Sequence, residues 1–378
     1  MDELTLLRSA RSDIEGPNEA VLVRGREALL ERADAEGDRS HVGSMTQGRR
    51  SLRFRLVGAG IGTAAAAAIV TGLVVTNVFG FAAWRGGAEP AAADALHSAA
   101  LAAIETSDPI VAEGQYLLVD TTAVLGATTT PDGDTYVSYL TISDEQLYVP
   151  ADRTDPWVWS RSLTKPYETF GPESERAAEE RWQEAVAERG EGSRELVEAA
   201  GGDFYSYPSP VGPAALAALP RDPQKLLNHI YEVTRGTGRS ADGEALVYIA
   251  ELLHSGVVPA DLRAALYEAV AGIPGVEITE KVATLDGQVG MSIGRVETAD
   301  NTRQDIIIDP TTGLFIGERE VNLEAAWGFP ANTATKWTSV RTSVVDDAPS
   351  GGTPNGYADL DGCTLTAPGQ FQCPASKG

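Results

Sequence analysis

The stretch VEITEKVATLDGQVGMSIGRVETADNTRQDIIIDPTTGLFIGEREV, at residues 276–321, decides the fold class of this 378-residue chain. Its β-branched and apolar residues recur in short runs separated by turn residues, a pattern that is typical of strands. The segment Asp-Pro-Thr-Thr-Gly at 309–313 is a strong hairpin signal, because these residue types favour tight turns. The stretch therefore predicts a meander of four strands, at 276–285, 288–297, 304–309 and 314–321.

Further strands are predicted on both sides of this meander. β-branched and aromatic residues alternate at 114–124 (GQYLLVDTTAV) and 135–142 (TYVSYLTI), with the turn-rich TTTPDGD between them. Residues 146–164 continue as strand, turn and strand, and 338–345 (TSVRTSVV) are expected to close the sheet. Short turns between consecutive strands favour antiparallel pairing.

Helices are predicted between the two sets of strands. In DPQKLLNHIYEVT, at 222–234, Pro223 stands just inside the start and apolar residues recur at helical spacing. The charged run at 173–200 is predicted to be a solvated helix or an insertion. Three more helices are predicted, at 89–107, 243–254 and 260–271. The order of elements predicts an α+β domain with a curved, half-barrel-like antiparallel sheet and an inserted helical block.

A single membrane span is predicted before this domain. Residues 56–84 contain no Asp, Glu, Lys, Arg or His over 29 positions, and a spanning helix needs about 20 mostly apolar residues. One basic residue, Arg85, follows closely, whereas four precede the span: Arg49, Arg50, Arg53 and Arg55. Because basic residues mark the cytoplasmic side, residues 1–55 are predicted to stay inside and the remainder to lie outside the cell membrane.

A cleaved export signal is the alternative for this segment. If translation begins at Met45, MTQGRRSLRFRLVG is similar to a signal with a twin-arginine pair, and the Ala-rich EPAAADA at 89–95 would supply a cleavage site. However, Leu52 and Arg53 stand where Phe-Leu is expected. A permanent anchor is therefore the favoured interpretation.

The net charge of −24 and the isoelectric point near 4.5 argue against nucleic acid as a partner. Residues 1–55 hold ten acidic and ten basic side chains, so the whole net charge falls on the part predicted to be exported. One amphipathic helix is predicted from Pro17 to about Ala35. A single helix cannot form a core, so this segment is either a partly disordered tail or docks on a cytoplasmic partner.

The predicted organisation has four parts: a cytoplasmic segment at 1–55, a transmembrane helix at 56–84, an extracytoplasmic domain at 86–346 and an irregular tail at 347–378. The tail carries Cys363 and Cys373. A disulfide between them is predicted, because an oxidising location favours pairing and the loop would be small. Two free thiols are the alternative.

Gly-Met-Ser-Ile-Gly at 290–294 matches the G-x-S-x-G pattern of hydrolase nucleophiles. That site needs a helix after the serine and a histidine later in the chain. Here the flanks predict one continuous strand, and all four histidines precede Ser292: His41, His97, His229 and His254. The sequence therefore predicts no catalytic residue. It also predicts no metal or cofactor site, because Asp359 and Asp361 lack the other ligands of a calcium loop and the histidines are scattered.

Two further patterns indicate contacts rather than chemistry. Gly58 and Gly62 form G-x-x-x-G within the span, which permits close approach of two helices and a homodimer, although this spacing is also common by chance. Trp157, Trp159 and Tyr148 lie close in sequence. They are interpreted either as core packing or as an aromatic face that accepts an apolar ligand.

Three segments carry a resemblance to a known family. They are LPRDPQKLLNHIYEV at 219–233, VPADLRAALYEAVAGIPGVEI at 258–278 and IIIDPTTGLFIGEREV at 306–321, which follow a membrane span in this order. The chain resembles an uncharacterised family of actinobacterial single-pass membrane proteins, often encoded beside extracytoplasmic-function sigma factors. The resemblance implies a membrane-tethered outer domain with a half-open barrel similar to lipoprotein carriers and anti-sigma accessory proteins. It supplies no catalytic or ligand residues, and 173–200 does not match it.

Three functional hypotheses follow, in order of preference. The first is a non-enzymatic envelope protein whose outer domain senses or binds a ligand, with a link to sigma-factor regulation, or to another cytoplasmic regulator, through residues 1–55. The second is an anchored module that handles lipids or lipoproteins. An envelope hydrolase is the least favoured, because the sequence offers no catalytic constellation.

Overall fold

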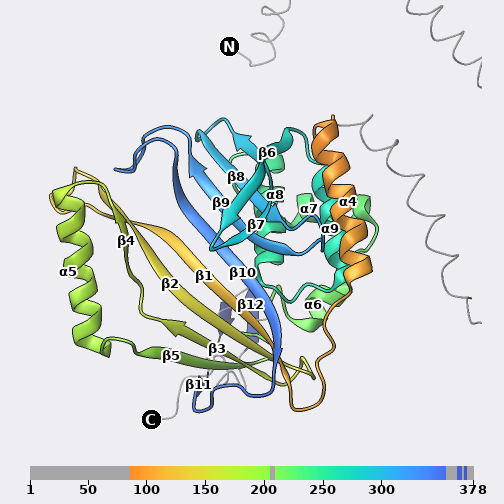
Figure 1. The fold of residues 1–378 in the computed structure, drawn as a ribbon, viewed down its shortest axis with the longest axis horizontal. Helices are drawn as coiled ribbons and strands as arrows, with labels where there is room; N and C mark the ends of the chain where they lie inside the picture. The colour runs from red at the N-terminus through yellow and green to blue at the C-terminus, as the bar shows by residue number, and fades with distance from the viewer. Residues whose placement is uncertain (1–85, 205–208, 355–363, 368–369, 373–378) are drawn as a thin grey trace, which may run out of the picture. The chain divides into compact units, whose positions relative to one another are not determined.

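The computed structural model describes residues 86–204, 209–354, 364–367 and 370–372 (Figure 1). The predicted cytoplasmic segment, the predicted span and the pair Gly58 and Gly62 lie outside these residues. Within the described ranges, no helix combines the length and the apolar character needed to cross a bilayer.

One large sheet dominates the described part of the chain. It contains eleven strands, in the order β11-β5-β3-β2-β1-β10-β9-β8-β7-β6, with β4 paired to β2. Neighbours pair antiparallel except β11 and β5, which are parallel. The strands are β1 Tyr116–Thr129, β2 Val137–Pro150, β3 Pro156–Ser162, β4 Lys165–Thr169, β5 Arg194–Ala200, β6 Val276–Leu285, β7 Gln288–Glu297, β8 Thr302–Ile308, β9 Phe315–Asn322, β10 Thr333–Val345 and β11 Thr353–Pro354.

The six described helices include the predicted block between two sets of strands, at 213–271; one helix precedes the first strand and one lies between the fourth and fifth strands. They are α4 Pro90–Thr106, α5 Pro172–Arg189, α6 Pro213–Ala218, α7 Pro223–Val233, α8 Ala241–His254 and α9 Ala260–Ala271. An α+β fold with an antiparallel sheet and inserted helices is therefore confirmed.

The main core lies between four helices and one face of the sheet (Figure 1). Fully buried side chains from α4, α7, α8, α9 and β8 meet there: Leu96, Leu226, Leu246, Leu266 and Ile306. Burial of this apolar area drives the packing, at roughly 25 cal/mol for each Å² removed from water. The helical block thus covers one face, and the ends of its helices border the cavities described below.

The meander at 276–321 forms as predicted, and local hydrogen bonds explain its last turn. Asp309 Oδ1 accepts from the backbone N–H of Thr311 at 2.8 Å, and Asp309 O accepts from Gly313 N–H at 2.8 Å. Gly313 has a φ of 66°, which glycine adopts without steric cost. These bonds place β9 directly beside β8.

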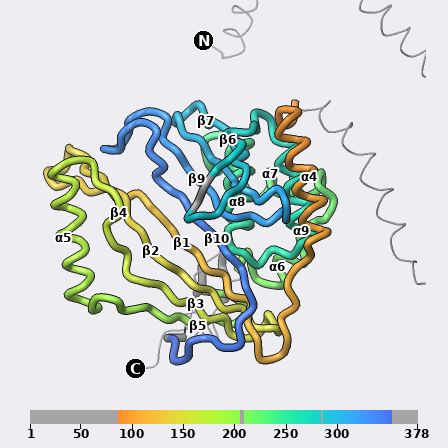
Figure 2. The backbone as a smooth tube through the Cα atoms, viewed as in Figure 1, coloured from red at the N-terminus to blue at the C-terminus, as the bar shows by residue number. Residues whose placement is uncertain are grey.

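β10 is a long strand near the middle of the sheet and runs beside β1 (Figure 2). Its pairing with β9 ends at Ser339 and Gly317, while its pairing with β1 continues to Val345. Beyond that point the tip of the β6–β7 hairpin reaches back to β10. Gln288 Nε2 donates to Ser339 Oγ at 2.9 Å, and Arg341 forms an ion pair with Asp286 at 2.7 Å.

The structure corrects two sequence-based expectations. Residues 173–200 are not one solvated helix, because α5 ends at Arg189 and 194–200 form β5 along β3. Val197 and Ala199 of β5 are buried in the main core. The tail expected to be irregular also contributes strands: β11 pairs with β5, and β12 Thr364–Ala367 pairs with β13 Gln370–Gln372.

Candidate functional site

A cavity of about 200 Å³ lies between the sheet and the end of α8, and we call it the aromatic pocket. Apolar cavities of about 150 Å³ in other proteins hold a benzene ring, so its volume is sufficient for part of a small apolar ligand. Its walls are mostly apolar, with four polar side chains among them. The lining residues are Val119, Thr121, Glu145, Leu147, Trp157, Trp159, Gly202, Phe204, Val211, His254 and Ser255.

Two tryptophans of β3 form one wall. Trp157 and Trp159 are two positions apart on the strand and so face the same side of the sheet. Trp159 packs edge-to-face on Phe204, with 5.3 Å between ring centroids. Trp157 is fully buried, and its Nε1–H donates to Arg153 O at 2.9 Å. The ring contact therefore fixes the position of Trp159, and the hydrogen bond fixes that of Trp157.

Tyr148 does not join this wall, although the sequence grouped it with the tryptophans. It pairs across the sheet with Val158, which lies between Trp157 and Trp159 on β3. Directly paired residues point to the same face, so Tyr148 lies on the opposite face. Its hydroxyl donates to Gln146 Oε1 at 3.2 Å.

Glu145 brings a carboxyl group into the pocket. Its Oε2 accepts from Trp159 Nε1–H at 3.1 Å. Burial raises the pKa of Glu145, and the nearby Arg161 guanidinium, which stacks 4.6 Å from the Trp159 ring centroid, opposes that rise. The carboxyl can thus take up a proton more readily than an exposed glutamate, which would make it a hydrogen-bond donor to a ligand.

His254 is the last residue of α8 and contributes a ring to the pocket. Its Nδ1 lies 3.1 Å from Thr338 Oγ1 and 3.6 Å from Glu318 Oε1. Burial lowers the pKa of His254; Glu318 opposes this effect and Lys336 reinforces it. A lowered pKa favours the neutral imidazole near pH 7. Sequence analysis placed this histidine only at a helix border, and no local signal indicates Thr338, which is 84 positions away.

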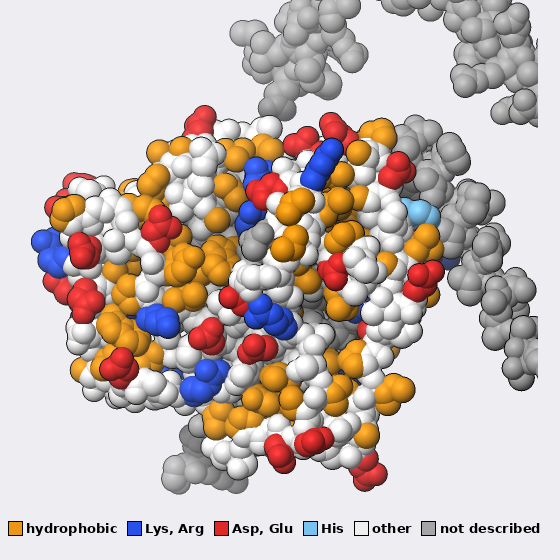
Figure 3. Space-filling view, viewed as in Figure 1, with side chains coloured by type: hydrophobic (Ala, Val, Ile, Leu, Met, Phe, Trp, Pro, Cys, Tyr) orange, Lys and Arg blue, Asp and Glu red, His pale blue; other side chains and the backbone are white. Residues whose placement is uncertain are grey.

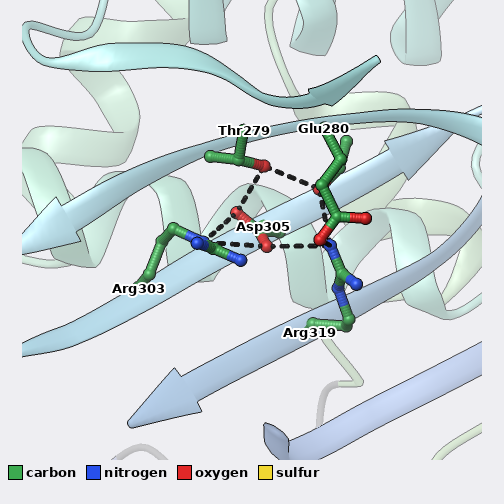
Figure 4. A network of polar contacts seen from close by, with 6 residues as sticks. Thr279, Glu280, Arg303, Asp305 and Arg319 are labelled. Atoms are coloured by element: carbon green, nitrogen blue, oxygen red, sulfur yellow. Dashed lines mark hydrogen bonds and ion pairs between the residues drawn. The ribbon is translucent and has the colours of Figure 1, made fainter. Parts of the chain in front are cut away.

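The G-x-S-x-G segment lies within β7, as the sequence predicts, and belongs to a polar cluster on the other face of the sheet (Figure 4). Ser292 alternates with Ile293, which packs in the main core, so the serine faces away from the helices. Its Oγ lies 2.9 Å from Thr279 Oγ1 and accepts from Arg319 Nη2 at 3.2 Å.

A fully buried carboxylate is at the centre of this cluster. Both carboxylate oxygens of Asp305 accept hydrogen bonds from Arg303 Nε, at 3.0 and 3.1 Å. Its Oδ2 also accepts from Arg319 Nη2, at 3.3 Å. Arg319 also pairs with Glu280 at 2.9 Å. The cluster joins β6, β7, β8 and β9, and each of its charged side chains forms at least one ion pair within it, although Arg319 Nε has no hydrogen-bond partner among the described residues. Because these ion pairs link neighbouring strands around a buried carboxylate, the cluster contributes to the packing of this part of the sheet.

Gly294 of the motif has a packing explanation in the same cluster. A Cβ atom at this position would lie 2.1 Å from Asp305 Oδ1. Glycine therefore leaves room for the buried carboxylate, which is a different reason from the sharp turn that hydrolase motifs need.

Cys363 and Cys373 lie outside the described residues. The neighbouring hairpin pairs Thr364 with Gln372, which follow and precede the two cysteines in sequence. This register is compatible with the predicted disulfide, which stays a prediction.

Neither a scan of protein-family models nor a search of curated proteins found a match to this chain. The family resemblance of the segments at 219–233, 258–278 and 306–321 therefore stays a prediction.

Proposed function

We propose that this chain is a membrane-anchored, non-enzymatic binding protein whose outer domain, residues 86–346, takes an apolar ligand in the aromatic pocket. The observation that carries the proposal is the pocket itself. Two tryptophans, Phe204 and aliphatic side chains line a cavity with a volume of about 200 Å³. Apolar walls with few polar groups are typical of small-molecule binding sites.

The polar groups of the pocket support recognition of a ligand with one polar end. Glu145 has a raised pKa because of burial, and His254 has a lowered one. Burial acts against the charged form of each group, and both line a mostly apolar pocket, which suits an uncharged hydroxyl or carbonyl more than a second ion. We expect a long-chain alcohol or a similar neutral amphiphile to bind with its polar end at these two residues.

The proposal includes a half-barrel form of the sheet and an anchor at 56–84. The contacts of Gln288 and Asp286 with β10 support strong curvature, because the hairpin tip must pass the ends of β8 and β9 to reach it. In sequence, α4 begins at Pro90, shortly after the proposed anchor ends at residue 84, which supports a short connection along the chain. A curled sheet with helices on one face provides the cavity that a lipid-handling or sensing domain requires.

The test is site mapping with a photoreactive probe. The full-length chain in nanodiscs of zwitterionic lipid is irradiated with decan-1-ol that carries a diazirine, and the cross-linked peptides are identified by mass spectrometry. We expect labelling on β3 and on the peptide that contains Phe204 and Val211. Leu147→Trp fills the pocket and should lower this labelling about tenfold, because a filled cavity excludes the chain.

The matched control is Leu125→Trp, which adds the same group at an exposed position of β1. It should leave the labelling within about twofold of the unmodified chain. Unchanged circular dichroism in both variants shows that they fold. Equal labelling of the pocket peptides in both variants would contradict the proposal.

A further inference from the structure

We infer that a second cavity binds the anionic head of an amphiphile, and we call it the arginine cavity. It encloses about 300 Å³ and opens where β10 continues beyond its last pairing with β9. Three of its lining residues are arginines: Arg153, Arg263 and Arg341. This inference is independent of the proposed function, since the cavity shares no lining residue with the aromatic pocket.

The charge at this cavity is opposite to that of the chain. The molecule carries a net charge of −24, and acidic side chains are spread over the face seen in Figure 3. Among the described residues that line the arginine cavity, however, three are cationic and one, Asp108, is acidic. Cationic groups gathered in a partly buried place repel one another unless an anion joins them. Asp108 pairs with Arg263, and Asp286, which lies outside the lining, pairs with Arg341. One cation, Arg153, therefore remains without an ion pair among the described residues, and this residual positive charge indicates an anionic ligand.

Arg263 is the most deeply placed of the three, with 6% of its surface exposed. Its Nη1 donates to Val258 O at 3.0 Å, and its Nη2 pairs with Asp108 at 3.2 Å. Its Nε is buried and has no hydrogen-bond partner among the described residues. Asp108 also accepts from the backbone N–H of Ala260 at 2.7 Å, so its carboxylate serves two groups. Arg263 also lines the cavity, so its guanidinium charge can act on an oxyanion bound there.

The other two arginines have donors left for a ligand. Arg153 Nη1 donates to Val257 O at 2.8 Å, and no described residue forms an ion pair with Arg153. Arg341 is oriented by its ion pair with Asp286 at the tip of the β6–β7 hairpin. A guanidinium carries five N–H donors in a planar fork that matches the two oxygens of a carboxylate.

The remaining walls select an amphiphile rather than a free ion. Apart from Gln288 and Thr342 they are mostly apolar, with contributions from β1, α8, the α8–α9 turn, β9 and β10: Leu117, Leu253, Val257, Val258, Phe315 and Val340. A small hydrated anion gains nothing from such walls, whereas an alkyl chain is removed from water there. The ligand class is therefore an oxyanion head on an apolar chain, such as a fatty acid.

A glycine contact separates the two cavities. Gly256 lines the arginine cavity, and a Cβ atom there would lie 2.5 Å from Val119 Cγ1, which belongs to a residue of the aromatic pocket. Its φ of 67° also favours glycine. Because these two residues are in direct contact, each cavity can be changed without opening the other.

The test uses diazirine-labelled decanoate on the full-length chain in zwitterionic nanodiscs, with cross-links mapped by mass spectrometry. We expect labelling of the α8–α9 turn and the end of β10. Arg153→Gln and Arg341→Gln should each lower it about tenfold, as expected for loss of a charge-assisted hydrogen bond. Arg239→Gln is the matched control, because Arg239 forms a comparable ion pair with Asp300 on the exposed surface, and should leave labelling within about twofold.

Three comparisons make the result decisive. Diazirine-labelled decan-1-ol should label these segments at least about tenfold less than decanoate, since it lacks the charge. Inorganic phosphate should not compete at concentrations where unlabelled decanoate does; equal competition would show a site for free anions and overturn the inference. Leu147→Trp should leave decanoate labelling unchanged. Loss of decanoate labelling in that variant, with normal labelling in both arginine variants, would place the ligand in the aromatic pocket and also overturn the inference.

Discussion

Asp305 and Ser292 illustrate how a single residue can be placed by packing rather than by chemistry. Both are fully buried on the face of the sheet away from the helices. The carboxylate is matched by Arg303 and Arg319, and the serine hydroxyl belongs to the same set of contacts. A charge in this position is tolerated because its partners are present, so removal of one partner has a large effect.

Asp305→Asn is expected to lower the free energy of unfolding by about 3 kcal/mol, because two arginines then lack their buried counter-ion. Urea unfolding of the full-length chain in detergent, followed by tryptophan fluorescence, measures this change. The control Asp300→Asn removes the partner of Arg239 from an exposed pair and should cost less than about 1 kcal/mol. Equal losses of unfolding free energy in the two variants would show that the buried cluster stabilises the fold no more than the exposed ion pair does.

A single residue, His254, is also expected to make the free energy of unfolding depend on pH. Burial lowers the pKa of this histidine below its ordinary value of 6.5, against the effect of Glu318 and with that of Lys336. Between the folded and unfolded pKa values, the unfolded chain holds more protons, so this residue makes the folded state less stable as pH falls through about 6.5. Glu145 and Glu251, whose pKa values burial raises, act in the opposite direction.

The variant His254→Gln isolates this contribution, because both glutamates remain in it. Between about pH 7.5 and about pH 5.5, the unmodified chain should lose more unfolding free energy than the variant. Urea titrations of both chains at the two pH values provide the measurement. A larger loss in His254→Gln would mean that Glu318 stabilises the charged imidazole by more than burial destabilises it, contrary to the lowered pKa.

At the scale of elements, helices with local signals were predictable and strands that depend on distant partners were less so. α7 and α9 occupy the predicted positions because Pro223 and the apolar spacing act within a few residues. β5 was missed, since its seven residues follow a charged helix and acquire their character from pairing with β3. β11 is defined by two residues along β5, which no local pattern indicates.

The cap of α7 offers a test at this scale. Asp222 accepts at Oδ1 from the backbone N–H of Lys225, at 2.9 Å. Asp222→Ala should lower the free energy of unfolding by about 1 kcal/mol, as measured by urea unfolding, because that N–H loses its side-chain acceptor. Asp222→Asn retains the cap and should stay within a few tenths of a kcal/mol of the unmodified chain. A loss as large in the Asn variant would show that charge rather than capping is responsible.

At the scale of the whole molecule, the two cavities could not be read from the sequence. The sequence grouped Trp157, Trp159 and Tyr148, but the register between β2 and β3 places Tyr148 on the opposite face from the two tryptophans. Glu145 and His254 belong to elements more than a hundred positions apart, and only the folded sheet brings them to one pocket. The arginine cavity likewise joins residues from Arg153 to Arg341.

The predicted membrane topology is also tested at this scale. Because the basic residues precede the apolar segment and the net charge follows it, protease added to whole cells should digest residues 86–378 and spare 1–55. Antibodies against each part, used on protease-treated and detergent-opened cells, distinguish the two. Protection of residues 86–378 together with digestion of residues 1–55 would show that the orientation is the reverse of the predicted one.

The central claim is that the outer domain binds a neutral apolar ligand in the aromatic pocket. Native mass spectrometry of the full-length chain, released from nanodiscs after addition of decan-1-ol, tests this claim most directly. We predict one bound decan-1-ol for the unmodified chain and for Leu125→Trp, and loss of about nine-tenths of that occupancy in Leu147→Trp. The same occupancy in all three chains, or none in the unmodified chain, would contradict the account.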